Sequence, residues 1–301
     1  MKLALTGGTG FVGSRVIDAA VATGHEVCAL VRRPQPDRPS VTWVAGSLSD
    51  RDALESLVDT ADAVIHVAGV INASTAADFE AGNVDGTLAM LAAATAAGTR
   101  RFVHVSSLAA REPQISLYGA SKARAEELVE GSGLDWTIVR PPAVYGPGDR
   151  ETLELFKMAK LGLLVMPSRG HLSIIHVDDL ARLLLAMTAQ DAPNQQLVEA
   201  DDETQGGWTH RGFGEALGAA VGRRPLILSA PAALLKLGAR ADQLIRRGKA
   251  KLTADRAAYF SHEDWVIDVN RRPPPDLWRP AIPTDQGLAD TAAWYRDHGW
   301  L

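Results

Sequence analysis

A glycine-rich stretch near the start of the chain constrains its fold more than any other feature. The short apolar run KLALT at 2–6 leads directly into TGGTGFVG at 6–13. From Gly13 to Ala22, apolar residues then recur at the spacing of an α-helix. A strand, a tight turn of glycines and a helix are therefore expected in that order, which is how many α/β folds begin.

The same alternation of strand and helix continues through the first half of the chain. Further strands are predicted at 26–31, 41–46, 63–69, 101–107 and 135–141, and long helices at 78–97 and 116–133. Ser49 and Asp52 have the spacing of a capping box, which predicts a helix from there to about Val58. The strands are nearly continuous apolar runs, as in a parallel sheet with helices on both faces. We therefore predict an α/β fold with a doubly wound parallel sheet.

The spacing of the glycines indicates a bound dinucleotide. Gly8, Gly10 and Gly13 match G-x-G-x-x-G in the strand–turn–helix context that this fingerprint requires. Backbone without side chains can approach a pyrophosphate closely, and the helix start offers free N–H groups. At the end of the second strand, where an NAD site places an acidic residue, the chain has Arg32 and Arg33. Since arginine pairs well with a 2′-phosphate, NADP(H) is favoured and NAD(H) is the alternative.

Three further residues indicate proton-transfer chemistry. Tyr118 and Lys122 are four positions apart at the start of a predicted helix, so they share one face. A lysine ammonium near a phenol lowers the phenol pKa, which would let Tyr118 exchange a proton with a substrate oxygen. Ser107 ends a predicted strand, where ligands bind in such sheets, and it can donate a hydrogen bond to a carbonyl.

With these motifs the chain resembles the short-chain dehydrogenase/reductase superfamily, and within it the extended type, or NAD-dependent epimerase/dehydratase family. The segments that carry the resemblance are TGGTGFVG at 6–13, HVAG at 66–69, NVDGT at 83–87, VSS at 105–107, YGASK at 118–122, RPPAVYGPGD at 140–149 and IHVDD at 175–179. The ending GLADTAAWYRDHGWL also fits the family, so the resemblance covers nearly the whole chain.

The resemblance implies a role for each matching position. The positions that would line the cofactor are Gly7, Thr9, Gly10, Phe11, Val12, Gly13, Arg32, Ser47, Leu48, Val67, Ala68, Gly69, Lys122, Pro141 and Val144. The implied catalytic residues are Tyr118 as general acid/base, Lys122 on the nicotinamide ribose and Ser107 on the substrate oxygen, with Asn83 as a structural residue nearby. Ser47 stands where relatives usually have an aspartate that reaches the adenine.

The chain is expected to divide into a Rossmann-type domain at 1–150, to which 173–190 returns, and a smaller C-terminal substrate lobe at 151–301. In this later part, helices are predicted at 150–161, 178–189, 209–221, 231–247 and 284–298. The proline-rich stretch at 270–280 is expected to be an extended surface segment.

The expected reaction is NADP(H)-dependent hydride transfer, either reducing a ketone or aldehyde of a small organic substrate or oxidising the alcohol. Two alternatives stay open. One is a nucleotide-sugar epimerase or dehydratase with a tightly bound NAD(P), which could hold a diphosphate with Arg211, Arg223 or Arg224. The other is a non-catalytic, cofactor-binding assembly subunit.

Composition limits the partners that we expect. The net charge of −5 argues against a nucleic-acid binder, and the single cysteine, Cys28, fits a reducing cytoplasm. No apolar run reaches the roughly 18 residues of a membrane span. Neither His66 nor His176 has metal-ligand spacing to other residues, so no metal is expected. We expect no membrane partner, and the resemblance suggests a homodimer through the helices near 78–97 and 118–131.

Overall fold

The computed structural model describes residues 1–73, 75–231, 258–260 and 262–301, which divide into two compact units. The first unit contains 1–141, 178–199 and 269–279, and the second unit contains the rest of the described chain. The first segment of this unit ends at Pro141, where the sequence predicted a boundary at residue 150. Apart from Pro231, the helix predicted at 231–247 lies outside the described residues.

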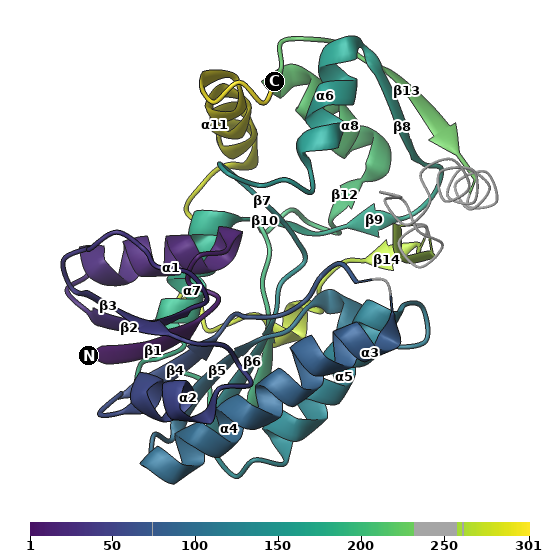
Figure 1. Ribbon diagram of the computed structural model, residues 1–301. Helices are drawn as coiled ribbons and strands as arrows, with labels where there is room; N and C mark the ends of the chain where they lie inside the picture. The colour runs from purple at the N-terminus through teal and green to yellow at the C-terminus, as the bar shows by residue number, and fades with distance from the viewer. Residues whose placement is uncertain (74, 232–257, 261) are drawn as a thin grey trace. The chain divides into compact units, whose positions relative to one another are not determined.

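A seven-stranded parallel sheet forms the centre of the first unit (Figure 1), in the order β11-β6-β5-β4-β1-β2-β3. Its strands are β1 (Lys2–Thr6), β2 (Glu26–Val31), β3 (Val41–Ala45), β4 (Ala63–His66), β5 (Arg101–Val105), β6 (Asp135–Arg140) and β11 (Gln196–Glu199). The chain proceeds from β1 out to β3, then crosses back and continues from β4 in the other direction. This confirms the doubly wound sheet and places its point of reversal between β1 and β4, where ligands bind in such folds.

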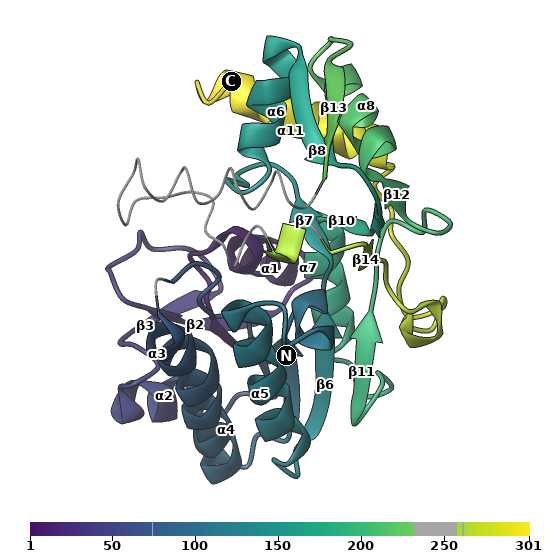
Figure 2. The same ribbon diagram turned by 90° about the vertical axis from the view of Figure 1, so that its right-hand side faces the viewer.

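Helices cover both faces of this sheet (Figures 1 and 2). On one face lie α2 (Arg51–Val58), α4 (Gly86–Ala97) and α5 (Leu117–Glu130), and on the other α1 (Phe11–Ala22) and α7 (Val177–Ala186). Val64 of β4 belongs to the apolar cluster under α2 and α4, whereas Val103 of β5 points to the opposite face. Both valines are fully buried because both faces are covered.

Two helices begin differently from the prediction. The N-cap of α2 is Asp50, whose side chain accepts a hydrogen bond from the Ala53 N–H at 3.2 Å. The predicted capping box at Ser49 is therefore wrong, since its hydroxyl instead bonds to that of Ser47 at 2.9 Å. The helix predicted at 78–97 forms as three consecutive pieces, α3 (Ala76–Phe79), a π-helical turn (Glu80–Asp85) and α4.

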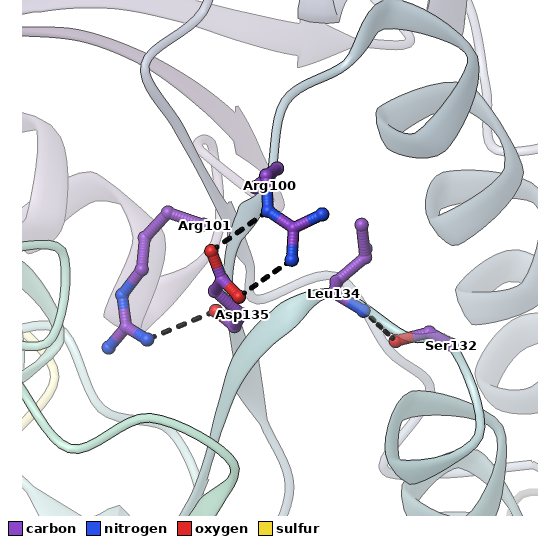
Figure 3. Close-up of polar contacts among 5 residues, drawn as sticks. All are labelled: Arg100, Arg101, Ser132, Leu134 and Asp135. Carbon is purple, nitrogen blue, oxygen red and sulfur yellow. Dashed lines mark hydrogen bonds and ion pairs between the residues drawn. The ribbon is translucent and has the colours of Figure 1, made fainter.

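At the amino-terminal edge of the sheet, two adjacent arginines use different partners (Figure 3). Arg100 is largely exposed and forms a two-bond ion pair with the Asp135 carboxylate, at 3.1 and 3.0 Å. Arg101 is half-buried and donates to the Asp135 carbonyl at 3.0 Å, the Met187 carbonyl at 2.7 Å and the Pro193 carbonyl at 3.2 Å. Because Met187 and Pro193 lie between α7 and β11, Arg101 attaches that connection to the sheet.

The second unit contains short sheets and helices around their own apolar core. The strands β8 (Leu163–Pro167) and β13 (Leu226–Ala230) form a parallel two-stranded ribbon, against which α6 (Leu153–Leu161) and α8 (His210–Ala220) pack. The remaining elements are β7 (Ala143–Tyr145), β9 (His171–Leu172), β10 (Ile174–His176), β12 (Trp208–Thr209), β14 (Asp264–Trp265) and α11 (Thr284–Asp297). The helices predicted at 150–161, 178–189, 209–221 and 284–298 are thus confirmed as α6, α7, α8 and α11.

The proline-rich stretch at 270–280 lies mostly at the surface, as its composition predicts, but it contains turns and is held by two buried side chains. Pro273 and Trp278 are buried within the first unit, and the Trp278 indole N–H donates to the Asp179 carbonyl at 3.1 Å. An indole needs a partner for its N–H once it is buried, and the start of α7 provides one.

Candidate active site

The glycine loop brings the end of β1, the start of α1 and the end of β4 into close contact. Gly7 has a φ of +75°, which favours glycine, and a Cβ there would lie 2.8 Å from the Ala68 nitrogen. A Cβ on Gly13 would lie 2.1 Å from the Gly7 carbonyl oxygen. Larger residues at these two positions would therefore separate the elements that meet at the point of reversal.

The start of α1 suits an anion. Its N-cap is Gly10, which provides no side-chain cap, and its first turn contains no acidic residue. The N–H groups of that turn and the positive end of the helix dipole thus lack the side-chain partners that usually satisfy them. A pyrophosphate fits here, and the positions predicted for it all lie in this loop and turn, namely Gly7, Thr9, Gly10, Phe11, Val12 and Gly13.

Other positions predicted to line the cofactor also lie at the carboxyl edge of the sheet. Arg32 directly follows β2 and is exposed, whereas the nearby Arg38 pairs with Asp18 at 2.9 Å. Ser47 and Leu48 follow β3, and Val67, Ala68 and Gly69 follow β4. The Pro141 carbonyl accepts a hydrogen bond from the Leu108 N–H at 3.1 Å, and Val144 lies on β7 in the second unit.

The three predicted catalytic residues come from two neighbouring elements of the first unit. Ser107 follows β5, and its hydroxyl accepts a hydrogen bond from the Ala109 N–H at 3.2 Å. Tyr118 lies in the first turn of α5 and hydrogen-bonds to Ser107 through its side chain. Lys122, one turn further along, is buried and donates to the Val105 carbonyl of β5 at 2.7 Å. The structure therefore brings the hydroxyl pair together and ties the lysine to the same strand.

The environment changes the pKa of both ionisable residues. Burial raises the pKa of Tyr118 above its ordinary value, and the hydrogen bond with Ser107 offsets this only in part. The expectation that Lys122 lowers the phenol pKa is therefore wrong for this arrangement. Burial lowers the pKa of Lys122 to about 8, although the nearby Glu126 carboxylate acts in the opposite direction. At neutral pH, Tyr118 is consequently a protonated phenol that can donate a proton.

Asn83 connects the loop after β4 to the helix that carries Tyr118. Its side-chain oxygen accepts from the Val70 N–H at 2.6 Å, and its amide donates to the Val70 carbonyl at 3.0 Å and to the Ser121 hydroxyl at 2.8 Å. Ser121 in turn donates to the Tyr118 carbonyl at 2.8 Å. Asn83 lies in the π-helical turn, a feature frequent at functional sites. The sequence predicted Asn83 as structural but missed Ser121, because its partner is 38 residues away.

Two buried histidines lie next to this network. His66 forms hydrogen bonds with the hydroxyls of Thr6 at 2.7 Å and Thr87 at 3.2 Å, and its ring stacks on His104 at 5.6 Å between centroids. Burial lowers the pKa of His66 to about 3 and that of His104 well below its ordinary value. Both rings are therefore neutral at physiological pH. Within the described part of the chain, no cluster of His, Cys, Asp and Glu suits a metal ion.

The fold is of the NAD(P)-binding Rossmann type, and the site holds Ser107, Tyr118 and Lys122, to which the resemblance assigns the catalytic roles of an extended short-chain dehydrogenase/reductase. The model of the NAD dependent epimerase/dehydratase family matches residues 3–198. The chain belongs to this family, as its motifs predict.

Two similar proteins are named as reductases. The ceramide reductase of Caulobacter vibrioides is 37% identical over 99% of this chain and 96% of its own length. A ketoreductase of Stigmatella aurantiaca, named for a farnesylated 3-oxo-dihydroquinoline-1-oxide, is 34% identical over 50% of this chain and 52% of its own length. Among solved structures, the Bordetella bronchiseptica enzyme WbmG in complex with NAD aligns over 100% of this chain and 95% of its own, with a TM-score of 0.77 and 20% identity. At that identity, the solved structure supports the fold alone.

Proposed function

We infer that the chain is an NADPH-dependent reductase that converts the ketone of a long-chain lipid to an alcohol. The observation that carries this proposal is the protonated Tyr118 hydrogen-bonded to Ser107, with Lys122 buried one turn away. The two relatives described above support it, since both are named as reductases of compounds that bear a long hydrocarbon group.

In the reduction, the side chains of this site hold the carbonyl and deliver a proton. The Ser107 hydroxyl accepts from the Ala109 N–H and is hydrogen-bonded to Tyr118, and its hydrogen would turn to the substrate carbonyl when the substrate binds. NADPH, when bound, supplies the hydride that reduces the carbonyl carbon. As negative charge develops on the substrate oxygen, Ser107 stabilises it and the Tyr118 phenol donates its proton. Lys122, held by the Val105 carbonyl, contributes a positive charge beside the reacting groups.

Replacing the acid tests the mechanism. Tyr118→Phe is expected to lower kcat by about a thousandfold, because the ring remains and only the transferable proton is lost. Binding of NADPH, measured by fluorescence titration, should change little. Tyr295→Phe is the matched control, since its hydroxyl donates to the Asp149 carbonyl and interacts with Thr152 rather than with the proposed catalytic residues, and it should retain turnover. A Tyr118→Phe enzyme with undiminished turnover would contradict the mechanism.

The cofactor preference is tested at the end of β2. Arg32→Asp should weaken NADPH binding by about 10- to 100-fold, the loss of a charged hydrogen bond, and leave NADH binding nearly unchanged. Equal affinities of the unaltered protein for the two cofactors would overturn the NADPH preference. Release of one tightly retained NAD per chain on denaturation would instead support the alternative of a nucleotide-sugar epimerase.

A further inference from the structure

The β8–β13 ribbon presents an apolar face to solvent. Side chains alternate along each strand, so Leu164 and Ile227 point into the core of the second unit while their neighbours point outward. The outward side chains are those of Leu163, Val165, Leu226 and Leu228, which are 43%, 38%, 63% and 45% exposed. The register pairs Leu163 with Leu226 and Val165 with Leu228, so the four form one continuous patch.

Within the described residues, the helices that contact this ribbon pack against its other face. Both α6 and α8 contact the ribbon from the side of the buried Leu164 and Ile227 (Figure 1). Leu161, at the end of α6 immediately before β8, is 85% exposed and adds a fifth aliphatic side chain close to the patch. Contiguous exposed apolar surface of this kind marks an interaction site. We call these five residues the ribbon face.

Two arginines precede β13 in the chain. Arg223 and Arg224 also line a hollow of about 610 Å³ together with Arg211 of α8 and Ile227, whose side chain points to the side of the ribbon that α8 covers. The one acidic residue of this hollow is Glu215, which pairs with Arg211 at 3.8 Å. Arg223 and Arg224 precede Leu226, the first residue of β13, with only Pro225 between, so two positive charges lie in the chain that leads into the ribbon face. The positive charge next to the patch contrasts with the chain's net charge of −5.

We propose that the ribbon face, together with Arg223 and Arg224 in the chain that leads into it, docks the protein on a bilayer that contains anionic phospholipid. The aliphatic side chains would enter the boundary between headgroups and acyl chains, and the arginines would contact headgroup phosphates. No helix among the described residues is long and apolar enough to cross a membrane. The proposal differs from the sequence-based expectation of no membrane partner.

Charge favours a bilayer over a second copy of the chain. Two ribbon faces brought together would place Arg223 and Arg224 of both copies at one interface, and the hollow offers only the already paired Glu215 to neutralise them. Anionic lipid neutralises all of these arginines at once. The proposal also rests on the proposed function, because a reductase of long-chain lipids must reach substrate that resides in membranes.

Vesicle flotation of the full chain tests the docking directly. The protein should float with vesicles of phosphatidylcholine and phosphatidylglycerol in equal parts, and much less with phosphatidylcholine alone or at high salt. Leu226→Ser combined with Leu228→Ser, and Arg223→Glu combined with Arg224→Glu, should each lower the bound fraction at least about tenfold. Failure of the unaltered protein to float with the anionic vesicles would overturn the proposal.

Matched substitutions in the first unit control for effects on vesicle binding that come from any loss of apolar surface or reversal of charge. Leu88→Ser combined with Val269→Ser removes two aliphatic side chains that are 53% and 58% exposed in the first unit. Arg51→Glu combined with Arg124→Glu reverses the same amount of charge at exposed positions of that unit. Both controls should bind vesicles like the unaltered protein. Equal losses in the controls, or a dimer in light scattering that the ribbon variants convert to monomer, would contradict docking on a bilayer.

A comparison of two ketones separates this proposal from the proposed function. The ribbon variants should reduce a short, water-soluble ketone at the unaltered rate but a vesicle-borne lipid ketone more slowly. If the protein floats yet reduces neither ketone, docking holds and the proposed function fails. If it reduces both ketones equally well with and without the ribbon substitutions and does not float, the docking fails and the reductase stands.

Discussion

The central sheet of the first unit and the ribbon of the second unit use similar residues in opposite ways. Val64 and Val103 point to opposite faces of the central sheet and are both fully buried, because helices cover both faces. In the ribbon, Leu164 is buried while the adjacent Val165 is 38% exposed. Runs of aliphatic residues thus build a closed core in one unit and an open face in the other.

The difference also appears in the buried polar groups of the first unit, several of which find partners inside the protein. Arg101, Asn83 and His66 each bond to groups from other elements, since their surroundings contain little water. The exposed side of the ribbon has no such requirement, which leaves it free for an external partner. The following predictions test this contrast, beginning with the largest effect.

The two arginines at the edge of the central sheet give the largest contrast in stability. Arg101→Met is expected to lower the free energy of unfolding by about 3 kcal/mol, since several buried carbonyls lose a charged donor. Arg100→Met loses only an exposed ion pair and should cost about 0.5 kcal/mol or less. Chemical denaturation of both variants measures the difference, and equal losses would show that the α7–β11 connection does not depend on Arg101.

Replacing valine by threonine compares the two sheets with almost no change in shape. Val64→Thr and Val103→Thr should each cost about 2 kcal/mol, because each introduces a hydroxyl into a covered face of the central sheet. Val165→Thr in the ribbon should change the stability by less than about 0.5 kcal/mol, since water reaches the new hydroxyl. The midpoints of urea unfolding check this, and a large loss at Val165 would mean that the ribbon face is covered.

Acid is expected to destabilise the folded protein through its buried histidines, by less than the substitutions at Arg101, Val64 and Val103 described above. The folded-state pKa of His66 is lowered to about 3, so between that value and the ordinary 6.5 the unfolded chain binds more protons than the folded one. The histidine's contribution to the free energy of unfolding is therefore fully present above pH 6.5 and is lost as the pH falls. One such histidine should lower the free energy of unfolding by about 1 kcal/mol near pH 5.8.

His104→Leu isolates part of this acid effect. The His104 ring has no hydrogen-bond partner, so the substitution removes a titrating group without leaving another polar group unpaired. The variant should show a shallower loss of stability between pH 7 and pH 5 than the unaltered protein, as measured by thermal unfolding at each pH. An identical pH profile would show that His104 does not contribute to the acid sensitivity.

Short-range patterns predicted most of the first unit. The strands, the helices and the glycine loop depend on residues that are close in the sequence, and so does the pairing of Tyr118 with Lys122 on one helix. The sequence-based predictions failed at two kinds of position: where either of two neighbouring residues could cap a helix, and where a residue distant in the sequence provides the partner. Asp50 rather than Ser49 caps α2, and Trp278 is buried against the start of α7 despite its proline-rich surroundings.

Predicting the direction of the pKa shifts of Tyr118 and Lys122 also required the tertiary structure. The sequence gives the spacing of Tyr118 and Lys122 but not their burial, which raises the first pKa and lowers the second. The link from Asn83 through Ser121 to Tyr118 joins residues that only the folded chain brings together.

The sequence by itself determined the doubly wound sheet, the dinucleotide loop and the catalytic residues, because backbone conformation and helix spacing act over a few residues. Only the tertiary structure decided which aliphatic residues remain exposed. The alternation in the ribbon spans five residues per strand, too few to distinguish an open face from a covered one. Burial depends on which distant elements pack against a face, and for the ribbon α6 and α8 pack against one face alone.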